Sequence, residues 1–523
     1  STPLDVAATF IVLFTIYGAV LAKSGAGSFF IEWAFALFGK RPSASAPGRA
    51  TVASGFLLGT VSGSGVATTV TLATLSWPML KRSGYPANVA GGLLSAAGIG
   101  ALLSPPTLGA AAFIIAEYLQ VTYLDVLVMA AIPTVLYYLS CWLMVEADAR
   151  RLGVKPVKTS DASVWALTKA QGYHFISLGA IAVLLATGMS AFLAVFWSIA
   201  IAFGLSLLKP ETRLCLLPGA VAGVVVAMLA ALFGARASEA VFLGMTGATL
   251  YSVATHLGAL REKTACDAAA LRMVEALIDG ARNVVGVAAT CACAGIIVSV
   301  ITMTGLGLNI SRLIVEFGGE SLFLTILFAA LAMWLLGTAL PVTASYIIAA
   351  VMLVPALTEV GVPEAAAHMF LFYYAVLADV SPPTALAPFA AAAVTRGEPF
   401  ATMMQAWKYC LPAFLVPFMF CLTPEGVALL FQGDAAQIAW TFVTACIAVA
   451  ALAAAFGGWM WDEANLSERV VAGAAGLALF YADAWADIAG LLLATVALGA
   501  HIVRIKGWMP QARERDDGDD EEA

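Results

Sequence analysis

A four-residue word that combines two hydroxyl groups with two prolines occurs twice in this sequence. Ser104-Pro105-Pro106-Thr107 recurs in the second half of the chain as Ser381-Pro382-Pro383-Thr384. Over the thirty positions that end with these words, eleven residues are identical, and seven of the eleven are Pro, Gly, Ser or Thr. Where a membrane helix is broken, hydroxyl oxygens and freed carbonyls can bind a cation, and the positive end of a half-helix attracts an anion. The repeated word therefore predicts a transport site built from two broken helices.

The composition predicts the kind of element that must hold such a site. Apolar residues make up 61% of the chain and charged residues 11%, whereas a soluble domain carries about 25% charged residues. Several nearly uncharged stretches approach the ~20 residues that a helix needs to cross a bilayer core: 6–22, 126–145, 214–234, 283–303, 437–457 and 484–503. We expect an all-α polytopic membrane protein with about a dozen transmembrane helices, two re-entrant helical hairpins and two broken helices. The lipid bilayer is its first expected partner.

Motifs of other classes of protein are missing from the sequence. There is no phosphate-binding loop, nucleophile elbow or HExxH word, and the eight Cys residues follow no metal-site spacing. We therefore expect no enzyme activity, no nucleic-acid partner, and no cofactor beyond a monovalent coupling cation.

Two helix-breaking words precede the Ser-Pro-Pro-Thr words and predict the hairpins. In segment 50–80 the middle reads Thr60-Val61-Ser62-Gly63-Ser64-Gly65, and in segment 321–357 the corresponding turn reads Gly337-Thr338-Ala339-Leu340-Pro341. Gly and Pro are the residues that helices tolerate least. Each segment is therefore expected to enter the membrane, turn at this word and leave on the same side.

Charge placement predicts opposite orientations for the two hairpins. Basic residues flank the first hairpin and mark the loops that the positive-inside rule assigns to the cytoplasm: Lys40, Arg41, Arg49, Lys81, Arg82, Arg150, Arg151, Lys155, Lys158, Lys209, Arg213, Arg261, Lys263, Arg504 and Lys506. Around the second hairpin the acids Glu316, Glu320, Glu359 and Glu364 accompany the single base Arg312. The first hairpin is expected to open to the cytoplasm and the second to the outside, which makes the halves an inverted repeat.

The two Ser-Pro-Pro words are predicted to end one half-helix and to begin the next. Ser is a favoured N-cap, and Pro is well tolerated at the first helical position. The freed carbonyls need partners in the bilayer core, and a bound cation supplies one; the alternative is that the prolines only shape packing. The predicted cation ligands are Ser62, Ser64, Thr107, Gly337, Thr343 and Thr384. The predicted anion contacts are Gly63, Gly65, Ser104, Pro105, Thr338, Pro341, Ser381 and Pro382.

One acid lies inside the repeat core. Asp379 precedes Ser381 by two residues in an otherwise apolar span, at the position where the first repeat has Leu102. A carboxylate at membrane depth costs at least ~2.5 kcal/mol on insertion scales. Asp379 is therefore a candidate for carrying a coupling proton or for neutralising a bound cation. The alternative is a capping or polar contact with the surrounding helices.

The hairpin and break words resemble a known family. The run Gly59–Ala67, followed by Pro78-Met79 and Gly84-Tyr85-Pro86, resembles the large membrane subunit of tripartite ATP-independent periplasmic (TRAP) transporters, and Ser104-Pro105-Pro106 is similar to that family's helix break. The stretch from Leu340 to Ala387 resembles the TAXI branch, in which the permease subunits are usually fused. The resemblance covers about residues 5–422, and residues 423–505 are similar to the extra C-terminal helices of many TAXI permeases.

The resemblance implies a secondary transporter with an elevator mechanism in the inner membrane of a bacterium. A periplasmic substrate-binding protein would deliver a small organic anion, which would enter with a cation, usually sodium, with protons as the alternative. Helices of a small membrane subunit would be a further partner. Fused family members carry these helices ahead of the region, and this chain lacks them there, so the subunit is expected to be separate or fused upstream.

The expected division of the chain follows from these assignments. The transport domain comprises residues 50–125 and 304–400, with one hairpin in each. The remaining expected parts are scaffold helices in 1–49, scaffold and connecting helices in 126–303, a scaffold helix in 401–422, extra transmembrane helices in 423–507 and an acidic tail in 508–523.

Two other classes of function are compatible with these features. The first is an ion-coupled elevator carrier of the dicarboxylate or citrate type that works without a binding protein, and a neighbouring gene for a binding protein would argue against it. The second is a membrane enzyme or scaffold, which the missing catalytic constellation disfavours.

Overall fold

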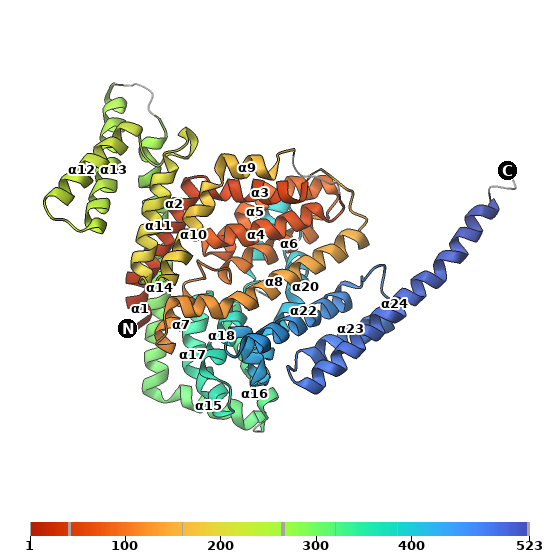
Figure 1. Cartoon of the computed structure of the whole chain (residues 1–523). Helices are drawn as coiled ribbons and strands as arrows, with labels where there is room; N and C mark the ends of the chain where they lie inside the picture. Colours follow the sequence, from red (N-terminus) through yellow and green to blue (C-terminus); the bar gives the residue numbers. More distant parts are fainter. Residues whose placement is uncertain are drawn as a thin grey trace.

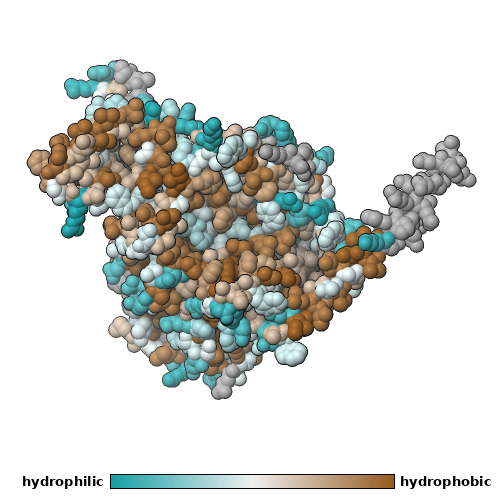
Figure 2. Space-filling view, viewed as in Figure 1, coloured by the Kyte–Doolittle hydropathy of each residue, from teal (hydrophilic) through white to brown (hydrophobic). Residues whose placement is uncertain are grey.

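The structure is a computed structural model that describes residues 2–39, 43–158, 161–262, 267–319, 321–383 and 385–519. Within these ranges the chain forms helices joined by short turns, and its only β-structure is two isolated bridges. Nine of the described helices are long and apolar enough to cross a membrane, and seven shorter apolar helices accompany them. Apolar residues also cover much of the outer surface, as expected where lipid replaces water (Figure 2). The predicted all-α polytopic membrane class is confirmed.

The first repeat consists of a helical hairpin and a broken helix. The hairpin is α4 (Ala46–Ser62) and α5 (Gly65–Ser83), and the broken helix is α6 (Ala87–Ile99) with α7 (Ala111–Leu119). A 3₁₀ turn, η2 (Gly100–Leu102), lengthens α6 at the break, and α8 (Tyr123–Arg151) follows. The hairpin begins at Ala46, so it includes residues upstream of the expected boundary at residue 50.

The second repeat has the same order of elements. Its hairpin is α16 (Leu322–Ala339) with α17 (Val342–Glu359), and its broken helix is α18 (Glu364–Ala378) with α19 (Leu386–Thr395). When the two Ser-Pro-Pro-Thr words are aligned, α5 and α17 begin at the same position, as do α6 and α18. The turns after α5 and α17 place Gly84 and Gly361 at φ 93° and 95°, a region that only Gly adopts without strain. The second hairpin turns at Leu340–Pro341, because α16 continues through Gly337 and Thr338.

The two repeats exchange their second half-helices. The α7 half-helix packs against α17 and α18 of the other repeat, and α19 packs against α5 and α6. At the residue level, Tyr118 near the end of α7 contacts His368 of α18, with ring centroids 5.8 Å apart. Thr395 at the end of α19 lies against Gly91 of α6, where an added Cβ would be 3.1 Å from its Oγ1. Such reciprocal contacts are those of two equivalent units related by a two-fold axis.

Small residues allow the first hairpin to lie directly on its broken helix. Gly55 and Gly59 are four residues apart on α4, the spacing of close helix pairs in membranes. A Cβ on Gly55 would lie 2.5 Å from the carbonyl oxygen of Ala97, and one on Gly59 would lie 2.6 Å from the Cα of Ala101. The backbones therefore touch where the tip of the hairpin meets the break.

The remaining helices lie beside and between the repeats, and some of them project outward (Figure 1). The N-terminal and middle helices are α1 (Thr2–Val6), the π-helical η1 (Ala7–Ile11), α2 (Val12–Lys23), α3 (Ala26–Gly39), α9 (Val164–Gln171), α10 (Tyr173–Ala186), α11 (Ala191–Ser206), α12 (Leu217–Leu232), α13 (Ala237–Glu262), α14 (Ala269–Thr304) and α15 (Leu306–Gly318), with the 3₁₀ turn η3 (Pro210–Thr212). The C-terminal elements are α20 (Pro399–Cys410), η4 (Leu411–Leu415), α21 (Val416–Leu422), η5 (Glu425–Leu430), α22 (Ala435–Gly457), α23 (Leu466–Leu479) and α24 (Ala484–Asp519). The α22 helix packs against α8, and α23 joins α22 to α24.

Candidate functional site

The tip of the first hairpin is a two-residue turn in which some of the polar groups form hydrogen bonds within the tip. Gly63 adopts φ 58° and ends α4, and Ser64 caps α5 because its hydroxyl accepts a hydrogen bond from the Ala67 amide. The Ser62 hydroxyl donates to the Ser64 carbonyl at 3.4 Å. Gly65 lies against Ile99, where a Cβ would come within 2.2 Å of the Ile99 side chain. Ser62 and Ser64 both remain accessible, so their free lone pairs can face a ligand.

Thr107 connects this tip to the first break. Its hydroxyl, which is buried, donates to the carbonyls of Thr60 at 2.7 Å and Gly59 at 3.3 Å, in the last turn of α4. A Cβ on Gly63 would lie 3.5 Å from the Thr107 carbonyl oxygen. The structure therefore brings Ser62–Gly65 together with Thr107, as the sequence predicts. The hydroxyl hydrogen of Thr107 is already used in hydrogen bonds to the carbonyls of α4.

The predicted N-cap role of the two Ser-Pro-Pro words is wrong. The residues that precede α7 and α19 are Ala110 and Ala385, and both words lie in the non-helical connections between the half-helices. The Ser104 hydroxyl instead donates backwards to Gly100 at 2.8 Å, and the Ser381 hydroxyl donates to Leu377 at 2.8 Å. A proline also disfavours helical backbone in the residue before it, so two in succession prolong the break. Each Ser therefore closes the first half-helix and does not start the second. In both words the Pro–Pro peptide bond is cis.

Hydroxyl groups from α8 satisfy the carbonyls of the first break. Tyr137 donates to Ala96 at 2.6 Å, and Tyr138 donates to Ala97 at 3.3 Å while it also accepts from Ser104 at 3.3 Å. Thr134 donates to Leu103, and Tyr123 donates to Pro106 at 3.0 Å. In a bilayer core such side chains are the usual replacement for lost helical bonds. At the first break these hydroxyls therefore already bind four carbonyls, and the expectation that a cation supplies a further partner stays a prediction.

The second break lacks this set of hydroxyls. The helices that follow the two repeats, α8 and α20, can be aligned on their N-caps, which are Thr122 and Glu398. In this alignment the equivalents of Tyr123, Thr134, Tyr137 and Tyr138 are Pro399, Cys410, Ala413 and Phe414. None of these four side chains carries a hydroxyl group. The two breaks, which are similar in sequence, thus differ in how their backbone carbonyls are satisfied.

Asp379 lies at the start of the second break, directly after the last residue of α18. Its side chain is partly accessible and forms no hydrogen bond or ion pair within the described ranges. Its counterpart Leu102 is 9% exposed and belongs to the hydrophobic core. Gly337 of the second hairpin packs against Ala378, where a Cβ would lie 2.4 Å from the Ala378 Cβ. The start of the second break, directly before Asp379 in the chain, therefore lies against the last turn of α16.

The other predicted residues of the second half lie close to this hairpin tip. Thr338 donates its hydroxyl hydrogen to Leu335 at 2.8 Å, Thr343 occupies the first turn of α17, and Pro341 is exposed. Pro105 and Pro382 are both partly accessible. Thr384 lies outside the described residues.

Sequence reasoning missed polar groups on the helices that flank the first tip. The hydroxyls of Thr68, Thr69 and Ser54 are buried and have no hydrogen-bond partner among the described residues. A Cβ on Gly98 would lie 2.2 Å from Thr69 Oγ1, so α5 and α6 are in direct contact there. The pair of threonines directly after the predicted tip was a visible signal, because polar residues inside membrane helices generally face the protein interior.

The geometry first defines a class of protein. Two similar repeats, each with a hairpin and a broken helix, in a polytopic membrane protein are the architecture of secondary transporters. A comparison with protein families then gives the family: the model of the tripartite ATP-independent periplasmic transporter, DctM component, matches residues 1–425. The chain belongs to this family, which is the large permease component of TRAP transporters. The predicted resemblance to that subunit is confirmed, and the assignment to the TAXI branch stays a prediction.

A curated relative agrees with the family. A protein of Haemophilus influenzae (strain ATCC 51907 / DSM 11121 / KW20 / Rd), named as a TRAP transporter large permease, is 30% identical over 114 residues. The match covers 22% of this chain and 26% of that relative, so it spans about a quarter of the relative's length.

Proposed function

We propose that the chain imports a small organic anion together with a cation, as the permease subunit of a TAXI-type TRAP transporter. A periplasmic binding protein delivers the anion, helices of a small membrane subunit complete the scaffold, and the complex works by an elevator mechanism in the bacterial inner membrane. The family membership supports the assignment as a permease subunit. Sodium is the proposed coupling ion, and a proton is the alternative.

The observation that carries the coupling proposal is the difference between the two breaks. At the first break, hydroxyls of α8 already satisfy four backbone carbonyls. At the second break the equivalent positions of α20 and the segment after it carry no hydroxyl, and Asp379 has no protein partner among the described residues. An unpaired carboxylate at membrane depth is costly unless a cation or a proton neutralises it. We therefore assign the exchangeable cation to the second break, near Asp379.

The N-termini of two half-helices provide a separate electrostatic attraction for the anion in this region. The α19 half-helix starts at Leu386, shortly after Ser381 and Pro382, and its first amides have no helical acceptors. The α7 half-helix starts at Ala111 in the equivalent position. Both N-termini carry partial positive charge, which favours a carboxylate group of the substrate. A bound cation near Asp379 would add to this field and would couple the two ligands.

Uptake into proteoliposomes tests the proposal. The permease is reconstituted with its small membrane subunit, the binding protein and a candidate anion, under an imposed sodium or pH gradient. We expect uptake that requires both the binding protein and sodium. Uptake of equal rate without the binding protein would support the dicarboxylate-type carrier instead.

The Asp379→Asn variant tests the site within the same system. Asn keeps the shape of the side chain and removes its charge, so the sodium concentration for half-maximal uptake should rise about tenfold or more, the loss expected for one charge-assisted contact. Glu359→Gln, which alters an exposed acid at the end of α17, is the matched control. Loss of pH-driven uptake alone, with counterflow retained, would assign a proton to Asp379. Unchanged uptake under both gradients would remove Asp379 from coupling.

A further inference from the structure

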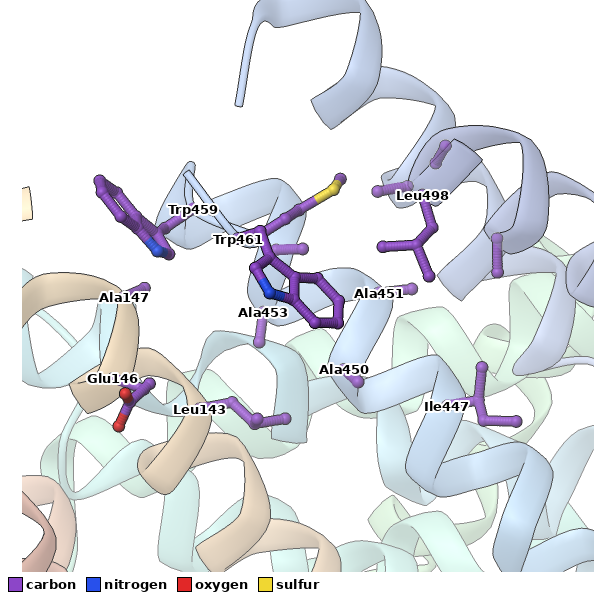
Figure 3. A pocket seen from close by; sticks show the side chains of 15 residues that line it. Leu143, Glu146, Ala147, Ile447, Ala450, Ala451, Ala453, Trp459, Trp461 and Leu498 are labelled. Carbon is purple, nitrogen blue, oxygen red and sulfur yellow. The ribbon is translucent and has the colours of Figure 1, made fainter. Parts of the chain in front are cut away.

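A pocket that the transport site does not use opens beside the C-terminal helices. It has a volume of about 360 Å³, and eight of its fifteen lining residues are alanines. Figure 3 looks into it: Leu143 and Glu146 belong to α8, Ala450 and Ala451 to α22, and Leu498 to α24. The volume lies within the range of about 300–1,000 Å³ that is usual for small-molecule sites.

The pocket exists because α22 and α24 diverge from each other. Both helices pack along α23, but they make few contacts with each other. Gly476 and Gly490 allow the close approaches to α23, since a Cβ on either would lie within 2.7 Å of a leucine side chain. Alanines on the facing sides of α22 and α24 cannot fill the remaining wedge. Residues 435–457 and 484–506 are both candidate membrane spans, so the wedge opens at the depth of the lipid chains.

One end of the pocket carries an indole N–H that has no acceptor among the described residues, and a guanidinium lies close to it, 3.6 Å from where a Cβ on Gly458 would be. The indole Nε1 of Trp459, which lines the pocket, is buried and has no hydrogen-bond acceptor among the described residues. A buried indole N–H usually has such an acceptor. The adjoining guanidinium of Arg469 donates through Nε to Ala455 at 2.8 Å and forms no ion pair with any described acid. Arg469 is one turn before the lining residue Ala472 on α23, so it lies on the same helix face.

Charge placement assigns this polar end to the cytoplasmic side. Glu146, at the pocket wall, is paired with Arg49 and Arg150. Arg504, near the end of the last span, binds Glu468 in the first turn of α23 at 2.7 Å. Arginines gathered at one end of the spans mark the cytoplasmic ends under the positive-inside rule.

We propose that this pocket binds a phospholipid of the inner leaflet, with one acyl chain in the alanine-lined wedge. Its phosphate or ester oxygens accept the hydrogen bond of Trp459 Nε1 and face the charge of Arg469. Apolar walls with one donor-rich cationic end complement an amphiphile with an anionic head group. A transmembrane helix of a partner would fit less well, because a wedge of about 360 Å³ is too small for a helix about 10–12 Å across and suits a single flexible acyl chain. The lipid would fill the wedge and hold α24 at its angle to α22.

Lipid binding to the purified full-length chain tests this proposal. Native mass spectrometry of delipidated protein is used to titrate dioleoylphosphatidylglycerol and, in parallel, diolein, which has the same acyl chains and no phosphate. We expect one tightly bound phospholipid per chain and weaker binding of diolein. Trp459→Phe and Arg469→Gln should weaken phospholipid binding about tenfold or more, because each removes a polar contact to the phosphate or ester group. Arg469→Gln should leave diolein binding unchanged.

The wedge itself is tested by filling it. Ala450→Phe places a ring in the pocket and should abolish the bound lipid. Ala439→Phe is the matched control, since it is an exposed position on the same helix, about three turns away and on a similar face. If Ala450→Phe fails to fold, Ala454→Leu serves the same purpose. Equal phospholipid binding by the filled and control variants would overturn the proposal, as would retention of detergent molecules only.

Discussion

The hydroxyl of Tyr137 offers the sharpest test of the difference between the two breaks. Tyr137 is fully buried, its hydroxyl donates to Ala96 at 2.6 Å, and it lies 3.3 Å from the sulfur of Cys410. Tyr137→Phe keeps the ring and removes only the oxygen. The Ala96 carbonyl then remains without this donor in a site from which water is excluded. An unsatisfied buried group costs about 1–3 kcal/mol, which lowers the ratio of folded to unfolded protein roughly 5- to 150-fold.

The measurement has two parts, because the two possible roles of the Tyr137 hydroxyl, structural partner or ion ligand, predict different results. Reversible unfolding in mixed detergent micelles should show a loss of stability of about 1–3 kcal/mol for Tyr137→Phe. The sodium concentration for half-maximal uptake should stay unchanged. Tyr481→Phe, at an exposed position, controls for the loss of a hydroxyl as such. A variant with unchanged stability and altered sodium dependence would refute the assignment, since it would make the first break an ion site.

Three further predictions follow from the hairpins and their contacts. Cysteines that replace Lys81 and Glu359, on a background without native cysteines, should be labelled from opposite sides of the membrane; labelling from one side would contradict the inverted orientation. Gly59→Ala should destabilise the protein by about 1–3 kcal/mol, because the new Cβ would lie 2.6 Å from a backbone atom of Ala101, whereas Gly179→Ala, inside α10 with open space around it, should cause no loss of stability and a gain of up to about 1 kcal/mol in the same unfolding assay. Thr343→Val removes an oxygen from the first turn of α17 and should raise the sodium concentration for half-maximal uptake; an unchanged value would exclude Thr343 as a ligand.

Much of the architecture could be predicted from the sequence because membranes restrict the possible structures. A helix satisfies its own backbone hydrogen bonds in lipid, so the long uncharged stretches of a chain with 61% apolar residues indicate the polytopic helical class. Gly and Pro mark the places where those helices stop, and the turn after Ser62 and the break at Ser104 lie where these residues predict them. The repeated Ser-Pro-Pro-Thr words also predicted a hairpin ahead of each break, and in the structure the second helices of these hairpins, α5 and α17, begin at corresponding positions.

Tertiary structure decided which groups form hydrogen bonds with the backbone carbonyls and hydroxyls at the two helix breaks. The sequence shows a hydroxyl at Ser104 and another at Ser381, but not that each donates back into its own half-helix. Nor does it show that Tyr137 and Thr134, both distant in sequence from the carbonyls they bind, reach the first break from α8. Local signals specify where a helix ends, because that depends on neighbouring residues. The group that satisfies a freed carbonyl depends on which distant helix packs against it, and only the folded chain determines that contact.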